Sequence, residues 1–257
     1  MLSVERRKHI LDILKRDKRV LVSQLSAQFQ VSEETIRRDL EKLEKEGYAT
    51  RTYGGALLCE ETKAKAELPY VIRKQTNVVE KRIIAELVSD MIRDGDFIML
   101  DESSTSAFVA RAIKKKKNIT LITNSIEIIL EVSGASGWNI LSTGGILKPN
   151  VLALTGHQAE AFIKTYHVDL AVISCTGVDL ESGFTDAGED NAIIKRSMMK
   201  AADRTIFAID STKFDRKAFA PICPLSGIST IVTDREPDEK WRNAFRENSI
   251  TAIYPDA

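Results

Sequence analysis

Three side chains suited to DNA binding recur at helical spacing near the N-terminus. Thr35, Arg38 and Lys42 stand at positions i, i+3 and i+7, so a helix would carry them on one face. Arg37 adds a second guanidinium beside this stripe. Hydroxyl, guanidinium and ammonium groups donate hydrogen bonds to phosphate oxygens and base edges of duplex DNA. The spacing therefore predicts a helix with a DNA-binding face.

Such a helix needs a buried opposite face, and the sequence predicts one within a helix-turn-helix at residues 20–39. The inward positions hold Ile36, Leu40 and Leu43. Ser32 is placed to cap the first turn with its hydroxyl. A preceding helix over residues 22–29 would bury Leu25 and Phe29 at i, i+4 spacing. In this motif the second helix enters the major groove of DNA.

A wing is predicted directly after the helix-turn-helix. Two short β-prone runs flank Gly54 and Gly55, a pattern typical of a hairpin. Arg51 and Tyr53 would lie on this hairpin, within reach of phosphates. Residues 1–58 are therefore expected to form a winged helix-turn-helix domain.

Two other interpretations of this segment have to be weighed. An Arg-Arg pair on a helix is usually a solvated face, and a three-helix unit with a hairpin can also bind proteins. The ordered combination of a capped helix, early Thr and Arg residues, inward apolar residues and a wing favours DNA. Residues 1–58 hold 12 Lys or Arg against 9 Asp or Glu, a difference of +3. Because this charge is weak, we expect a homo-oligomer, a dimer or tetramer, on one DNA site.

Composition places the chain among ordinary globular proteins. Its 257 residues are 43% apolar and 29% charged, with a net charge of zero. No apolar run approaches the roughly 18 residues of a membrane span, and the polar, basic first residues do not resemble a signal peptide. The three cysteines and three histidines lack the spacing of metal ligands. We expect a cytoplasmic protein without a membrane partner, a metal or a cofactor.

Helical and strand patterns alternate over residues 80–257, after a charged segment at 59–79 that is expected to be a linker. Alternation of this kind predicts an α/β domain with a mostly parallel sheet flanked by helices. The expected strands are residues 97–100, 119–123, 139–142, 169–174, 205–209 and 229–233.

Hydroxyl and glycine residues follow several of these expected strands. In parallel sheets, ligands bind beyond the carboxyl ends of the strands. The hydroxyl-rich run from Asp101 to Ser106 would lie between a strand and a helix N-terminus, a position that favours anions. Lys213 would add a positive charge from a neighbouring strand. The pattern predicts a pocket for a small phosphorylated, hydroxyl-rich metabolite, although such residues also form the turns of any α/β fold.

The N-terminal segment resembles the DNA-binding domain of the DeoR family of bacterial transcriptional regulators. The similarity is carried by ERRKHILDILKRDKRV, by TIRRDL and by the wing with its paired glycines. The predicted DNA-binding residues on the helix and the wing are Ser32, Thr35, Arg37, Arg38, Lys42, Arg51 and Tyr53. Two positions depart from the family pattern: Leu21 replaces a frequent capping Ser or Thr, and Gln30 replaces a frequent Gly in the turn.

The C-terminal segment resembles the sensor domain of the same family, which is similar in fold to ribose-5-phosphate isomerase. LDESSTS, LITNS, STGG, GVDLESGFTDAGED and DSTKF carry the similarity. The effector-binding residues that this resemblance implies are Asp101, Ser104, Thr105, Ser106, Asn124, Gly144, Gly145, Asp179, Glu189 and Lys213. Ser103 stands where the family usually has Gly, and its side chain could narrow the loop.

The main alternative to a sensor is a sugar-phosphate isomerase that carries a DNA-binding domain. Such an enzyme needs a carboxylate base and a polarising cation, for which Asp179, Glu189 and Lys213 are candidates, with Asp190 and Lys195 nearby in sequence. GVDLESGF departs from the acidic isomerase motif, so the sequence favours a regulator without catalytic residues. We expect a repressor of a carbohydrate-catabolism operon that binds double-stranded operator DNA and is released by a phosphorylated sugar.

Overall fold

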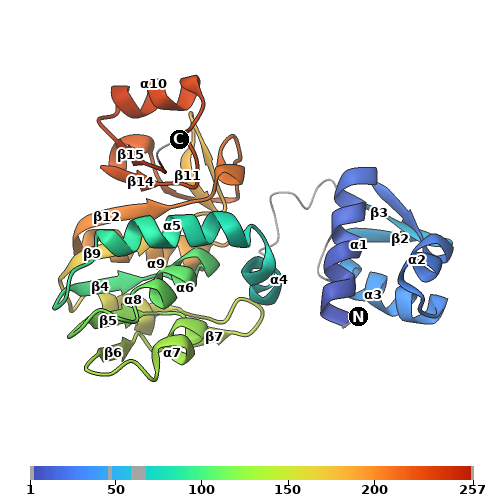
Figure 1. The fold of residues 1–257 in the computed structure, drawn as a ribbon, viewed down its shortest axis with the longest axis horizontal. Helices are drawn as coiled ribbons and strands as arrows, with labels where there is room; N and C mark the ends of the chain where they lie inside the picture. The colour runs from blue at the N-terminus through green and yellow to red at the C-terminus, as the bar shows by residue number, and fades with distance from the viewer. Residues whose placement is uncertain (1–2, 46–47, 59–67, 256–257) are drawn as a thin grey trace. The chain divides into compact units, whose positions relative to one another are not determined.

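The computed structural model describes residues 3–45, 48–58 and 68–255, and it contains two compact units that divide between Leu68 and Pro69 (Figure 1). Within these ranges no helix is long and apolar enough to cross a membrane. Each unit is described separately below.

The smaller unit contains three helices and a three-stranded antiparallel sheet. The helices are α1 (Ser3–Asp17), α2 (Val22–Phe29) and α3 (Glu33–Lys45). The strands are β1 (Arg19–Leu21), β2 (Ala49–Thr52) and β3 (Gly55–Leu58), in the order β1-β3-β2. The core holds Leu25, Ile36, Leu40 and Leu43, whereas Phe29 is only half-buried. The predicted helices and wing are confirmed; β1, three residues long, is an addition to the prediction.

The larger unit is built on a seven-stranded parallel sheet with the strand order β15-β14-β12-β9-β4-β5-β6 (Figure 1). In chain order these strands are β4 (Phe97–Leu100), β5 (Thr120–Thr123), β6 (Asn139–Ser142), β9 (Val168–Ile173), β12 (Ala202–Ala208), β14 (Thr230–Val232) and β15 (Thr251–Ile253). The predicted strands are all present, and the expected α/β class with a parallel sheet is confirmed.

Helices cover both faces of this sheet. Successive side chains of a strand point to opposite faces, and in the central strands both sets are buried. Ile98 and Leu100 of β4 pack with α4, α5, α6 and α7, whereas Met99 packs with α8, α9 and α10. These helices are α4 (Tyr70–Gln75), α5 (Val78–Asp90), α6 (Ser104–Ala112), α7 (Ile126–Val132), α8 (His157–Ile163), α9 (Glu189–Lys200) and α10 (Glu239–Glu247).

Two smaller sheets lie beside the main sheet, and the sequence patterns did not reveal them. One is the hairpin of β7 (Ile146–Lys148) and β8 (Ala153–Thr155). The other joins β10 (Gly177–Asp179), β11 (Gly183–Asp186) and β13 (Ala220–Cys223) in that order.

The larger unit begins at Pro69 rather than at residue 80. Tyr70 is 2% exposed and packs in the same apolar cluster as Ile84 and Val88 of α5. The last part of the expected linker is therefore part of the folded larger unit. Residues 59–67 of the expected linker lie outside the described residues.

Candidate DNA-binding and effector sites

The N-terminus of α3 is fixed by the predicted hydroxyl cap. Ser32 Oγ accepts a hydrogen bond from the Thr35 N–H at 3.2 Å and lies 2.8 Å from Thr35 Oγ1. Beyond this cap Arg37, Arg38 and Lys42 are exposed, and Thr35 is half-buried. The first turns of α3 thus present the predicted polar face to solvent.

Each arginine of this surface forms an ion pair with a carboxylate of the protein. Arg37 pairs with Glu33 at 2.6 Å and Arg38 with Glu34 at 3.4 Å, both at i,i+4 spacing on α3. On β2, Arg51 Nε lies 2.6 Å from a carboxylate oxygen of Glu44. These exposed pairs are individually weak, so phosphate oxygens can replace the carboxylates.

The wing packs against α3. A groove between them is lined by Arg37 and Leu40 of α3 and by Arg51 to Gly55 of the wing. Tyr53 is fully exposed at the tip, and Gly54 has a φ of +99°. Gly55 has no room for a side chain, because a Cβ would lie 2.1 Å from the Val20 carbonyl oxygen.

Asp39, the acidic residue of TIRRDL, has a structural role. It is 3% exposed, and its Oδ2 accepts a 2.5 Å hydrogen bond from Arg6 Nε of α1. Arg6 is also buried, so the pair joins α1 to the helix that carries the exposed arginines.

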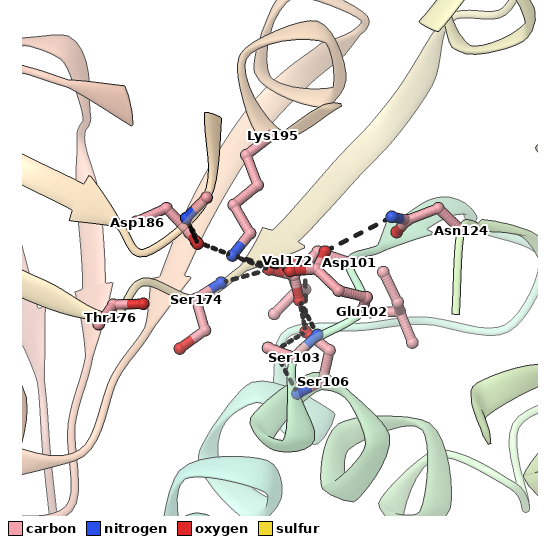
Figure 2. A network of polar contacts seen from close by, with 12 residues as sticks. Asp101, Glu102, Ser103, Ser106, Asn124, Val172, Ser174, Thr176, Asp186 and Lys195 are labelled. Carbon is pink, nitrogen blue, oxygen red and sulfur yellow. Dashed lines mark hydrogen bonds and ion pairs between the residues drawn. The ribbon is translucent and has the colours of Figure 1, made fainter. Parts of the chain in front are cut away.

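In the larger unit, polar side chains converge where β4, β5 and β9 end (Figure 2). Lys195 of α9 is at their centre, 2% exposed. Its Nζ lies 2.5 Å from Asp186 Oδ2, 3.2 Å from Glu102 Oε1 and 3.3 Å from Asp101 Oδ2. We call Asp101, Glu102, Asp186 and Lys195 the ionic cluster. Burial alone would lower the pKa of Lys195, but the three carboxylates together raise it well above its ordinary value.

Asp101 organises the loop between β4 and α6. Its Oδ1 accepts hydrogen bonds from the Ser103 N–H and from Ser106 Oγ, and its Oδ2 accepts one from the Ser174 N–H after β9. Ser103 is the N-cap of α6, with φ −67° and its Oγ accepting from the Ser106 N–H. Because this backbone conformation is ordinary, the loop accepts Ser103 without strain.

Two family models match the chain. One, described as the DeoR-like helix-turn-helix domain, matches residues 6–62; the other, the DeoR C terminal sensor domain, matches residues 76–235. The chain belongs to the DeoR family. It is therefore a DNA-binding transcriptional regulator, as the sequence predicted.

Similar DeoR-family proteins span nearly the whole chain. The uncharacterized HTH-type transcriptional regulator YulB of Bacillus subtilis is 37% identical over 97% of this chain and 96% of its own length. A putative aga operon transcriptional repressor of Escherichia coli is 35% identical over 97% and 93%. The HTH-type transcriptional repressor GlcR of Bacillus subtilis is 34% identical over 98% and 96%. Ribose 5-phosphate isomerase from Plasmodium falciparum is a structural neighbour with 16% identity, a TM-score of 0.38 and 52% of each chain covered.

The structure gathers some of the effector residues expected for a DeoR-type sensor around the ionic cluster. Asn124 follows β5 and is fully buried, with its Nδ2 lying 3.5 Å from Glu102 Oε2. Ser104 and Thr105 are buried in the first turn of α6. Ser106 binds Asp101, as described above.

The other expected residues lie in more varied places. Asp179 is at the β10–β11 turn, where its Oδ1 accepts hydrogen bonds from the Glu181 and Ser182 N–H groups. Glu189 is exposed at the start of α9. Lys213 is in a 3₁₀ turn (Ser211–Lys213) after β12, rather than on a strand. The two glycines, Gly144 and Gly145, precede β7.

Three members of the ionic cluster were not among the predicted effector residues: Glu102, Asp186 and Lys195. Glu102 directly follows Asp101, and LDE could have drawn attention to it. Lys195 was noted only as lying near the candidate catalytic residues in sequence. The spacing of Asp186 and Lys195 in the sequence does not indicate their ion pair, because the two residues meet only when α9 packs against β11.

Proposed function

We propose that this protein represses a carbohydrate-catabolism operon and is released from its operator by a phosphorylated sugar. The observation that carries the proposal is the presence, in one chain, of an exposed arginine face on a capped α3 and a buried ionic cluster at the ligand-binding edge of a parallel sheet. In support, similar proteins are described as an aga operon repressor, a repressor and an L-fucose operon activator.

At the operator, α3 would enter the major groove. Thr35, Arg37, Arg38 and Lys42 would contact bases or phosphates from α3, while Ser32 would hold its first turn; Arg51 and Tyr53 would reach the flanking backbone from the wing. We propose that a dimer or tetramer places two such units on repeated or inverted half-sites, in the cytoplasm where the DNA lies. A multiple of one helical turn would separate the half-sites.

At the sensor, the charges favour different parts of a sugar phosphate at two places. The ionic cluster has three carboxylates and one ammonium, a formal charge of −2 when all four are ionised. Sugar hydroxyls would therefore face Glu102 and Asn124, because carboxylate and amide oxygens accept their hydrogen bonds. The phosphate would lie at the N-terminus of α6, near Ser104 and Thr105, with Lys213 as its counter-ion.

Binding without turnover is part of the proposal and can be tested directly. The full chain would be incubated with hexose, pentose and triose monophosphates and with inorganic phosphate. We expect one sugar phosphate to raise the melting temperature and to release a DNA fragment that the protein itself has selected from a random pool. No product should form; isomerised sugar would show an enzyme instead. A Lys213→Met variant should bind DNA but lose the response, whereas Lys164→Met, at an exposed position just after α8, should retain it.

A further inference from the structure

The β7–β8 hairpin is bounded at both ends by glycines in left-handed conformations. Gly144 and Gly145 before β7 have φ values of +63° and +103°, and Gly156 after β8 has +93°. Within the hairpin, Leu152 also has a positive φ, of 55°. Residues other than glycine rarely adopt such backbone angles. The segment between these glycines is therefore a distinct element, joined to the rest of the unit at conformationally special points.

On one side the hairpin is held by the effector site. Leu154 N–H donates to the Asn124 carbonyl oxygen at 2.7 Å, and Asn124 Nδ2 donates to the Leu154 carbonyl oxygen at 3.2 Å. The same Nδ2 faces Glu102 at 3.5 Å. Since an amide nitrogen has two hydrogens, Glu102 and Leu154 occupy both. A sugar hydroxyl that binds Glu102, or that accepts a hydrogen from Asn124, competes with one of these two bonds.

On its other side the hairpin holds α4, the first helix of the larger unit. Tyr70 N–H donates to the Asn150 carbonyl oxygen at 2.8 Å, and Arg73 Nη2 lies 3.5 Å from the Val151 carbonyl oxygen. Arg73 also lies over the Tyr70 ring, 5.7 Å from its centroid. Asn150 and Val151 form the tip of the hairpin between β7 and β8.

The end of α4 is tied to the rest of the unit by a buried lysine. Lys81 Nζ donates to the carbonyl oxygens of Arg73 and Thr76, each at 2.6 Å. Next to it, Asn77 Nδ2 donates to Asp210 Oδ1 at 2.9 Å. The helix is thus fixed at its C-terminal end, and the hairpin contacts its N-terminal end, where the chain arrives from the DNA-binding unit.

We propose that the β7–β8 hairpin couples the effector site to α4, and through α4 to the point where the chain leaves the larger unit for the DNA-binding unit. An effector that binds Asn124 alters the hydrogen bonds between Asn124 and Leu154. The hairpin then shifts about its flanking glycines, and its tip moves Tyr70. The ligand-driven part rests on the proposed function, but the mechanical link from Asn124 to Tyr70 does not.

The mechanical link is tested without any ligand by amide hydrogen exchange on the full chain. Asn124→Ala removes the side-chain bond to Leu154, so exchange at the Leu154 and Tyr70 amides should rise together, by about fivefold for one lost hydrogen bond. Gly156→Ala, which alters the hairpin boundary, should raise the same two rates. Ser133→Ala removes an exposed bond at the end of α7 and should leave both unchanged. Faster exchange at Leu154 with an unchanged Tyr70 amide overturns the proposal.

The functional part is tested by cutting the link at α4. Arg73→Met removes the contact to Val151, while Lys74→Met removes the neighbouring pair with Glu127 of α7 and leaves the hairpin untouched. Both variants should bind the selected DNA fragment and show the melting shift of the wild type with the active sugar phosphate. We expect only Arg73→Met to require a higher concentration of the sugar phosphate for DNA release, by at least about fivefold. If both variants release DNA at the same sugar-phosphate concentration, the coupling is overturned. If the wild type shows no melting shift, the proposed function is refuted, and the exchange experiment alone decides the link between Asn124 and Tyr70.

Discussion

Lys195 Nζ lies 2.5 Å from Asp186 Oδ2, and both side chains are about 2% exposed. The pair joins α9 to the end of β11, while the same ammonium reaches Asp101 and Glu102 after β4. One cation therefore balances carboxylates from two separate segments, the loop after β4 and the end of β11. Without it, three buried acidic groups would face one another in a medium that screens them poorly.

Replacing Lys195 with Met should destabilise the larger unit by about 3–5 kcal/mol, because a buried charge network that loses one partner leaves its other charges uncompensated. The remaining carboxylates should then take up protons more readily, so the loss should shrink as the pH is lowered. Urea denaturation of the full chain across the acidic range measures both effects. The matched control is Lys148→Met, which breaks an exposed pair with Asp190. A similar loss in both variants would contradict the central role of Lys195.

The buried pair of Arg6 and Asp39 should control the stability of the DNA-binding unit. Asp39→Ala leaves a buried guanidinium without its carboxylate, and we expect a loss of about 3–5 kcal/mol. Chemical denaturation followed by a probe placed in the smaller unit measures it. Asp17→Ala, which breaks the exposed pair with Arg16, should leave that transition in place. If Asp39→Ala unfolds like the wild type, the pair is not what joins α1 to α3.

Much of this structure could be predicted from the sequence because its signals are local. The 3.6-residue spacing of Ile36, Leu40 and Leu43 indicates which face of α3 is buried, and short apolar runs such as residues 97–100 mark the central strands. The hydroxyl-rich run from Asp101 to Ser106 pointed to the loop after β4, and the family resemblance supported it. The three-residue strands β1 and β7 are too short to show any period, so their pairing depends on partners far along the chain.

The candidate effector site was predictable only in part, for a related reason. Asp101 and Asn124 directly follow strands, so their place at the sheet edge follows from the parallel topology. Lys195 lies in the middle of α9, and nothing in its neighbourhood distinguishes it from an exposed helical lysine. Its role appears only when α9 packs against the sheet and buries it. Similarly, Tyr70 was expected in a linker because one short helix cannot show which core it joins.

The carboxylates paired with the arginines of α3 should limit non-specific DNA binding. Glu34 holds Arg38 in an exposed pair, so any phosphate must replace it. Glu34→Gln removes this competition, and we expect tighter binding to random DNA with a steeper salt dependence. Fluorescence anisotropy at several salt concentrations gives both values. Glu181→Gln, a change of the same charge far along the chain, is the control. Equal salt slopes for wild type and Glu34→Gln would show that the pair does not compete with phosphate.

A missing helix cap offers a way to stabilise the DNA-binding unit. Leu21 is the N-cap residue of α2, with extended backbone angles, and it provides no side-chain hydrogen bond to the helix. It is 47% exposed, so a smaller polar residue can replace it. Leu21→Thr should add about 1 kcal/mol by capping the first turn, whereas Leu21→Ala should not. Thermal denaturation distinguishes the two variants. Equal melting temperatures would mean that the new hydroxyl does not reach the helix.

Burial lowers the pKa of Lys81 from its ordinary 10.5 to about 8, although Asp210 opposes the shift. Lys213 and Arg73 also contribute to this lowered pKa, and Glu80 opposes it. Between about pH 8 and 10.5 the unfolded chain therefore binds a proton at Lys81 that the folded chain does not. By linkage, the free energy of unfolding gains up to about 3 kcal/mol from this group as the pH rises through that window.

The contribution of Lys81 is isolated by comparison with Lys81→Met, because other groups titrate in the same alkaline range. We expect the stability difference, wild type minus variant, to increase from about pH 8 to 10.5 and to level off above it. Urea denaturation at intervals across this range measures the difference. Lys240→Met provides a control, since its pairing with Asp215 raises the pKa of an exposed lysine. A difference that falls with rising pH would mean that the Arg73 and Thr76 carbonyl groups favour the charged ammonium over the neutral amine.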